Sequence, residues 1–211
     1  MRIAAGLHPH NAKHWSPEIE ERLRVLLHDK RTSCLGEIGL DYHYDLSPRE
    51  DQERVFRAQV RIAKEAGLPV MLHVREAHDD ALAIMRDEGW PEAGCILHCF
   101  TDDWETLEPW IDAGCSVTFG GALTFNNGDD IRAAAARVPE MQLMVETDSP
   151  YMAPKPLRGE VCEPAMVVFT ESALADARGA EGEERLALFR RVLTNAESML
   201  NRPPTAWQLG K

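Results

Sequence analysis

Short apolar runs alternate with amphipathic stretches along almost the whole chain. Runs rich in β-branched and other apolar residues predict strands over 2–7, 34–40, 69–74, 94–99, 115–120 and 141–146. The stretches between and after them predict helices over 17–29, 48–66, 78–88, 103–113, 128–137 and 164–178. Because parallel strands need long crossover connections, usually helical ones, this order predicts consecutive parallel βα units.

The chain carries signals for where its elements begin and end. Ser16-Pro17 and Ser47-Pro48 each place an N-capping serine before a first-turn proline. Residues 179–187 have the composition of a solvated loop that leads into a last amphipathic helix at about 184–200. We expect one domain over residues 1–211, with a flexible tail at 201–211.

Uninterrupted βα repeats form either a (β/α)8 barrel or an open doubly wound sheet. Polar residues decide between these folds, because a barrel gathers the ends of several strands on one face. Such residues end several of the predicted strands here, namely His8, Glu37, His73, His98 and Asp148. We therefore expect an α/β fold of the TIM type. No eighth strand is visible, so the barrel is expected to be incomplete.

Composition narrows the class of protein. The 211 residues include 44% hydrophobic positions, which is enough for a core, and the net charge of -12 argues against nonspecific binding of nucleic acid through surface charge. The five cysteines are odd in number and mostly lie in or beside apolar runs, as reduced buried thiols do. No apolar segment is long enough to cross a membrane. We expect a cytoplasmic protein.

Four of the strand-end residues form a candidate metal set: Glu37, His73, His98 and Asp148. Each has a simpler explanation when taken alone, since a strand histidine is commonly a core residue, Glu37 could pair with an arginine, and Asp148 could cap a turn. Their joint occurrence at equivalent strand ends weakens those explanations. Two imidazoles and two carboxylates suit Zn, Mn, Fe or Mg, and a bridging Glu37 would permit two ions.

Five segments in this order resemble the TatD-type metal-dependent DNases: GLHPH (6–10), GEIGLDYH (36–43), LPVMLHVREA (68–77), HCF (98–100) and ETDSPYMAP (146–154). The resemblance implies a TIM-barrel hydrolase that uses one or two divalent ions (Mg, Mn or Zn). It also implies cleavage of phosphodiester bonds in DNA by a metal-activated water, chiefly from 3′ to 5′ and on single-stranded ends. From the apolar segments we expect no membrane association, and we infer no obligate protein partner.

The resemblance assigns roles residue by residue. Glu37 corresponds to the bridging ligand, and His73 and His98 correspond to the ligands of one ion. Asp148 corresponds to a ligand of the other ion and to the partner of the attacking water, so Asp148 and Glu37 are the expected catalytic residues. Arg75 resembles a phosphate contact, although a salt bridge is an equal alternative. We expect His8 to contact the substrate.

Two features depart from the family pattern. Members begin with a strand that bears His-x-His, whereas this chain opens on what resembles the second strand, so the first βα unit is expected to lie upstream of Met1. An Asn-Glu-Pro segment is usual after the aspartate strand, and here Cys162-Glu163-Pro164 stands in its place. Two other readings stay open: an amidohydrolase-type enzyme that cleaves C–N bonds on a related barrel, or a non-catalytic barrel fragment.

Overall fold

The computed structural model describes residues 1–210, and the chain divides into two compact units. The first unit contains residues 1–97 together with the C-terminal segment from Ser198, and the second contains His98–Glu197. Within each unit the paired strands are parallel, and the described elements occur in βα order, as the sequence predicts.

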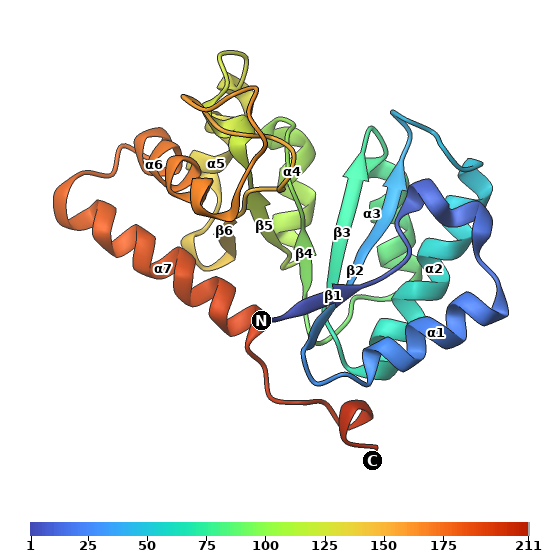
Figure 1. Ribbon diagram of the computed structural model, residues 1–211. Coiled ribbons are helices and arrows are strands. Elements are labelled where there is room, and N and C mark those ends of the chain that lie inside the picture. The colour runs from blue at the N-terminus through green and yellow to red at the C-terminus, as the bar shows by residue number, and fades with distance from the viewer. Residues whose placement is uncertain (211) are drawn as a thin grey trace. The chain divides into compact units, whose positions relative to one another are not determined.

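The first unit is built on four neighbouring parallel strands (Figure 1). These are β1 (Ile3–Ala5), β2 (Thr32–Asp41), β3 (Val70–Arg75) and β4 (Cys95–Leu97). Its helices are α1 (Pro17–Leu27), α2 (Arg49–Ala66) and α3 (His78–Glu88), with short 3-10 turns η1 (Pro9–His14) and η5 (Trp207–Leu209). Helix α2 buries its apolar face, including Val55, Phe56 and Val60, in the core of this unit.

Strand β2 is almost completely buried. Its pairing with β3 fixes the positions of the polar residues at the C-terminal ends of these two strands. The register places Gly39 opposite His73 and Asp41 opposite Arg75. Gly39 has a φ of 140°, and a Cβ at this position would clash with the carbonyl oxygen of His73. Glycine therefore permits the close approach that brings His73 alongside the end of β2.

The second unit contains strands β5 (Ser116–Phe119) and β6 (Leu143–Val145), which pair in parallel. Its helices are α4 (Trp104–Asp112), α5 (Asp129–Arg137), α6 (Val167–Ala177) and α7 (Gly182–Leu200, which ends beyond the unit), with 3-10 turns η2 (Gly121–Thr124), η3 (Glu140–Gln142) and η4 (Pro164–Met166). Phe119 and Trp110 are fully buried in its core. The polar residues after β5 and β6 lie just beyond these short buried strands.

The structure confirms one of the two predicted helix caps and corrects the other. The hydroxyl of Ser16 accepts a hydrogen bond from the N–H of Ile19, so it caps α1. Pro48, not Ser47, occupies the N-cap of α2. The hydroxyl of Ser47 instead accepts from the N–H of Lys13 and donates to the carbonyl of His10, because it is buried against the η1 turn.

Residues 201–210 carry contacts that the sequence did not reveal. Trp207 stacks on His28 with ring centroids 5.1 Å apart. The buried side chain of Gln208 donates to the carbonyls of Asp29 and Thr32. Four of the five cysteines are buried, as expected for core thiols. Among the described residues, no helix combines the length and apolar character that crossing a bilayer requires.

Candidate functional site

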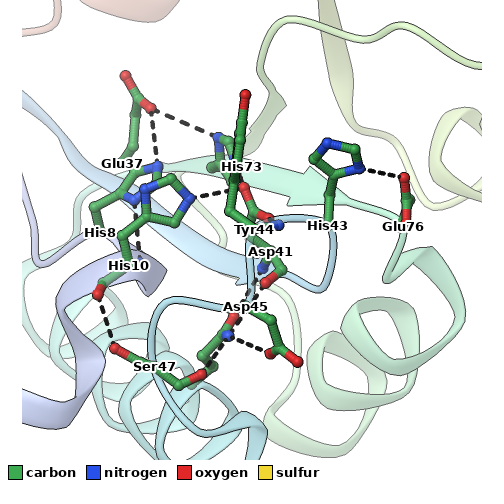
Figure 2. A network of polar contacts seen from close by, with 11 residues as sticks. His8, His10, Glu37, Asp41, His43, Tyr44, Asp45, Ser47, His73 and Glu76 are labelled. Atoms are coloured by element: carbon green, nitrogen blue, oxygen red, sulfur yellow. Dashed lines mark hydrogen bonds and ion pairs between the residues drawn. The ribbon is translucent and has the colours of Figure 1, made fainter.

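The polar end of β2 and β3 gathers three histidines and two carboxylates in the first unit (Figure 2). His73 comes from β3, Glu37 and Asp41 come from β2, His8 is the N-cap of η1, and His10 lies within η1. The Nδ1 atom of His73 lies 4.0 Å from Oε2 of Glu37, and Nε2 of His8 lies 3.9 Å from the same oxygen. The structure thus brings together the predicted ligands Glu37 and His73.

Asp41 organises this cluster, although the sequence analysis did not single it out. Its side chain is 0% exposed, and one oxygen, Oδ2, lies 2.9 Å from Nε2 of both His10 and His73. The other oxygen accepts the N–H of Tyr44 at 2.8 Å. Burial by itself raises the pKa of this carboxyl, but the hydrogen bonds from Tyr44, His10 and His73 outweigh it and lower the pKa to about 2. Asp41 is therefore an ionised acceptor.

The charge on Asp41 determines which histidine nitrogen carries the proton. Because an ionised carboxylate can only accept, Nε2 of His73 must donate to it, which leaves the Nδ1 lone pair of a neutral ring on the side of Glu37. His8 has the opposite arrangement, since its Nδ1 accepts the N–H of His10 at 3.2 Å. A neutral His8 then presents an N–H at Nε2, which suits a hydrogen-bond donor and not a metal ligand.

His98 and Asp148, the other two predicted ligands, meet in the second unit. Nε2 of His98 lies 3.6 Å from Oδ1 of Asp148. Nδ1 of the same ring lies 2.7 Å from Oε2 of Glu146, which also accepts the hydroxyl of Thr118 at 2.5 Å. The carboxylate again fixes the ring, but it holds the opposite nitrogen from the one that Asp41 holds on His73. The lone pair at Nε2 of His98 therefore faces Asp148.

Two groups of side chains have ligand atoms within 4.8 Å of one another among the described residues: His8, His10 and His73 in one unit, and His98, Glu146 and Asp148 in the other. The hydrogen bonds qualify the first group, because His10 is bound to Asp41 and His8 presents a donor. His73 is bound to Asp41 in the same way as His10, but its Nδ1 lies 4.0 Å from Oε2 of the predicted ligand Glu37.

The donors fit a divalent cation. In the part of the chain that is described, Oε1 of Glu146 is buried without a hydrogen-bond partner, which is costly unless an ion or water satisfies it. Both imidazoles are oriented through carboxylates, the usual arrangement behind metal-binding histidines. Asp148 itself has a φ of 57°, an uncommon value for a residue with a side chain, and such backbone conformations concentrate at functional sites.

The glycine pair Gly120-Gly121 follows β5 and lies beside this cluster. A Cβ on Gly120 would lie 3.6 Å from Sγ of Cys99 and 3.9 Å from the side chain of Glu146. A Cβ on Gly121 would clash with the carbonyl of Met152, which belongs to the loop after Asp148. Gly121 therefore allows that loop to lie directly on the backbone of η2.

Arg75 is the last residue of β3, and its guanidinium contacts an aromatic ring where a salt bridge was the alternative. The guanidinium carbon lies 4.9 Å from the centre of the Tyr44 ring, and among the described residues no carboxylate forms an ion pair with it. The neighbouring Glu76 is paired instead with His43, Oε1 to Nδ1, at 2.7 Å. Of the two alternatives for Arg75, the salt bridge is therefore not what the structure contains.

Asp41 and Glu146 are the residues that sequence reasoning missed. Both carried a signal, since Asp41 is four residues from Glu37 and Glu146 two residues from Asp148, and side chains two apart on extended backbone point to the same face. The motifs GEIGLDYH and ETDSP contain them, yet only one acidic residue of each was read as functional.

Comparison with known proteins identifies relatives over nearly the whole chain. The sequence profile of the family described as TatD related DNase matches residues 1–201. The metal-dependent hydrolase YcfH of Escherichia coli K12 is 41% identical over 182 residues, which are 86% of this chain and 68% of that protein. The 3'-5' ssDNA/RNA exonuclease TatD of Pantoea vagans is 37% identical over 202 residues, covering 92% and 76%.

A solved structure shows the same fold. The crystal structure of YJJV, a TatD homologue from Escherichia coli K12, superposes with a TM-score of 0.87 at 27% sequence identity, and the match covers 96% of this chain and 77% of that one. This likeness confirms the α/β fold of TIM-barrel type that the strand ends predict. The expected absence of a first βα unit stays a prediction.

Proposed function

This chain belongs to the TatD-related DNase family of metal-dependent hydrolases, and we propose that it hydrolyses phosphodiester bonds of single-stranded nucleic acid, DNA foremost, from the 3′ end. The observation that supports this most is the pair of carboxylate-oriented imidazoles, His73 and His98, each with a lone pair directed at an acidic side chain. The exonuclease name of the Pantoea relative supports the substrate.

In this proposal the predicted ligands bind divalent metal, Glu37 and His73 in the first unit and His98 and Asp148 in the second. Bound there, a divalent ion would lower the pKa of water and offset negative charge on a phosphoryl oxygen. Mg, Mn and Zn all suit the donor set. Asp41 and Glu146 keep the imidazoles oriented, and Oε1 of Glu146 is a further oxygen available on the second-unit cluster.

The remaining residues act on the substrate and on protons. Asp148 accepts a proton of the attacking water, whose oxygen bonds to phosphorus while the bond from phosphorus to the ester oxygen breaks. The departing oxygen takes up a proton from solvent and leaves as a hydroxyl. Arg75 contacts a phosphate oxygen, for which its guanidinium is suited because no carboxylate neutralises it among the described residues. His8 donates from Nε2 to a substrate oxygen. A cytoplasmic location, as expected from the sequence, fits such a substrate.

The test is a digestion assay on a single-stranded oligonucleotide that carries a label at its 5′ end. With added Mg²⁺ or Mn²⁺, the protein should shorten the labelled oligonucleotide stepwise from its 3′ end. Asp148→Asn should lower turnover by at least about 100-fold, since an amide is neither a base nor a good ligand. Exposed Asp112 supplies the matched control, Asp112→Asn, which should keep full activity.

Two results would contradict the proposal. If the chain left phosphodiesters intact with each metal yet hydrolysed a cyclic amide, the amidohydrolase alternative would replace it. If Asp148→Asn and Asp112→Asn digested DNA equally well, Asp148 would be a turn residue. An RNA oligonucleotide of the same sequence, run in parallel, measures the preference between the two nucleic acids.

A further inference from the structure

An aromatic ring stands at the rim of the first-unit cluster, and neither the predicted ligands nor the family motifs account for it. Tyr44 lies in the turn after β2 and is 54% exposed. Figure 2 shows it among His10, His43 and Asp41. An exposed ring of this size beside a polar site is not explained by core packing.

The backbone of Tyr44 is fixed to the same carboxylate that orients the cluster. Its N–H donates to Oδ1 of Asp41 at 2.8 Å, while Oδ2 of Asp41 holds His10 and His73. Any displacement of the turn would therefore disturb the hydrogen bonds of a buried carboxylate, which is unfavourable. The backbone that carries the ring is in this way held in a set position relative to His73.

Three neighbours surround the ring without hiding it. His10 and His43 meet it edge-to-face, with centroids 5.5 Å and 4.8 Å away, and the guanidinium of Arg75 lies 4.9 Å from its centre. Glu76 follows Arg75 in sequence but is paired with His43. Arg75, whose guanidinium lies over the ring, thus keeps its charge available for an anion, since no described carboxylate forms an ion pair with it.

We propose that Tyr44 is a stacking platform for an unpaired base of the substrate, with Arg75 contacting a phosphate attached to the same nucleotide. A ring for the base next to a guanidinium for the phosphate matches the two parts of a nucleotide, and every base has a face that stacks. A base inside a duplex cannot lie on the ring, so this contact favours single strands. The inference rests on the proposed function.

The test combines a change in the protein with a change in the ligand. Binding of a 5′-fluorescein thymidine decamer is measured by anisotropy in the Asp148→Asn background, with Mg²⁺ present, so that digestion does not interfere. The second ligand is a decamer of abasic sites, which has the same phosphates and no bases. Tyr44→Ala should weaken binding of the thymidine decamer between about 5-fold and 100-fold and leave the abasic decamer unchanged.

Three variants separate stacking from other effects. Tyr44→Phe keeps the ring and should bind both ligands as the parent does. Leu46→Ala removes an exposed apolar side chain from the same turn and should leave the affinity for both ligands unchanged. Arg75→Ala should weaken binding of both ligands by the same factor. It should also reduce the slope of log affinity against log salt concentration by about 0.7, the value for one phosphate contact on a single strand.

The outcomes are distinguishable. If the parent binds neither decamer, the proposed nucleic-acid function fails, and the inference fails with it. If the parent binds the thymidine decamer but Tyr44→Ala weakens both ligands equally or neither, the function stands and the stacking role is rejected. A loss for Tyr44→Phe equal to that for Tyr44→Ala would assign the effect to the hydroxyl and would also reject stacking.

Discussion

At the scale of single residues, this protein depends on buried groups whose ionisation state is set by their surroundings. Asp41 is kept charged by three donors, and Cys34 is kept neutral because burial raises the pKa of its thiol to about 12. The first sets the proton positions of two histidines. The second makes part of the stability of the fold dependent on pH.

Asp41→Asn tests whether that carboxylate positions His73. The carboxylate accepts hydrogen bonds from two imidazoles and from the N–H of Tyr44, and a neutral amide cannot accept all three equally well. The imidazole of His73 should therefore lose its fixed orientation. We expect metal affinity to fall about 10- to 100-fold, as for other partners of metal-binding histidines. Calorimetric titration with Mn²⁺ measures this. Asp45→Asn, on the exposed rim, is the control, and equal affinities for the two variants would refute the assignment.

Cys34 gives a pH dependence with a defined sign. Its folded pKa of about 12 is above the pKa of an unfolded thiol, about 8.5, so the folded state retains the proton as pH rises. Its contribution to stability is complete below about pH 8.5 and is lost progressively between there and pH 12. Urea unfolding between pH 8 and 10.5 should show a steeper fall in the free energy of unfolding for the parent than for Cys34→Ala. Parallel curves would show that the thiol does not titrate this way.

At the scale of elements, the pairing of β2 with β3 is the most constrained feature of the first unit. Gly39 lies between Glu37 and Asp41 and directly opposite His73, so one backbone position controls the spacing of three polar residues. The turn that follows then carries Tyr44. Changes in this pairing should therefore affect stability and the site together.

Gly39→Ala is expected to destabilise the fold by more than about 2 kcal/mol, because it combines an unfavourable positive φ with a clash against the His73 carbonyl. Gly179→Ala is a matched control. Gly179 also has a positive φ, 64°, but nothing lies within 4 Å of the added Cβ, so only the backbone term of about 1–2 kcal/mol applies. Thermal unfolding ranks the two variants, and the reverse order would show that β2 and β3 adjust to the methyl group.

At the scale of the whole molecule, the family relationship predicts that bound metal contributes to stability. An ion that binds the folded chain stabilises it by about 2.7 kcal/mol at a free concentration 100 times its dissociation constant. Dialysis against EDTA should lower the thermal midpoint by several degrees, and Mn²⁺, Mg²⁺ or Zn²⁺ should restore it. The His73→Ala/His98→Ala variant should show no such recovery. If neither the chelator nor the added metal changes the midpoint of thermal unfolding, the assigned ligands are wrong.

The strand order, the helix positions and four ligand candidates could be predicted from the sequence. This is because apolar periodicity and capping residues are local signals, and because parallel strands end on a common edge. The resemblance to TatD-type DNases rested on the same local motifs, and comparison confirmed it. Ser47 shows the limit, since its capping signal was real but its hydroxyl is engaged by η1, a segment distant in the sequence.

Only the tertiary structure decided how the side chains are held. The sequence placed Glu37, His73, His98 and Asp148 at strand ends, but it did not indicate that Asp41 fixes Nε2 of one imidazole and Glu146 fixes Nδ1 of the other. Nor did it pair Tyr44 with Arg75 or Glu76 with His43. Such contacts depend on distances between separate segments and on burial, which raises the cost of any unpaired polar group, and neither quantity is written in local sequence.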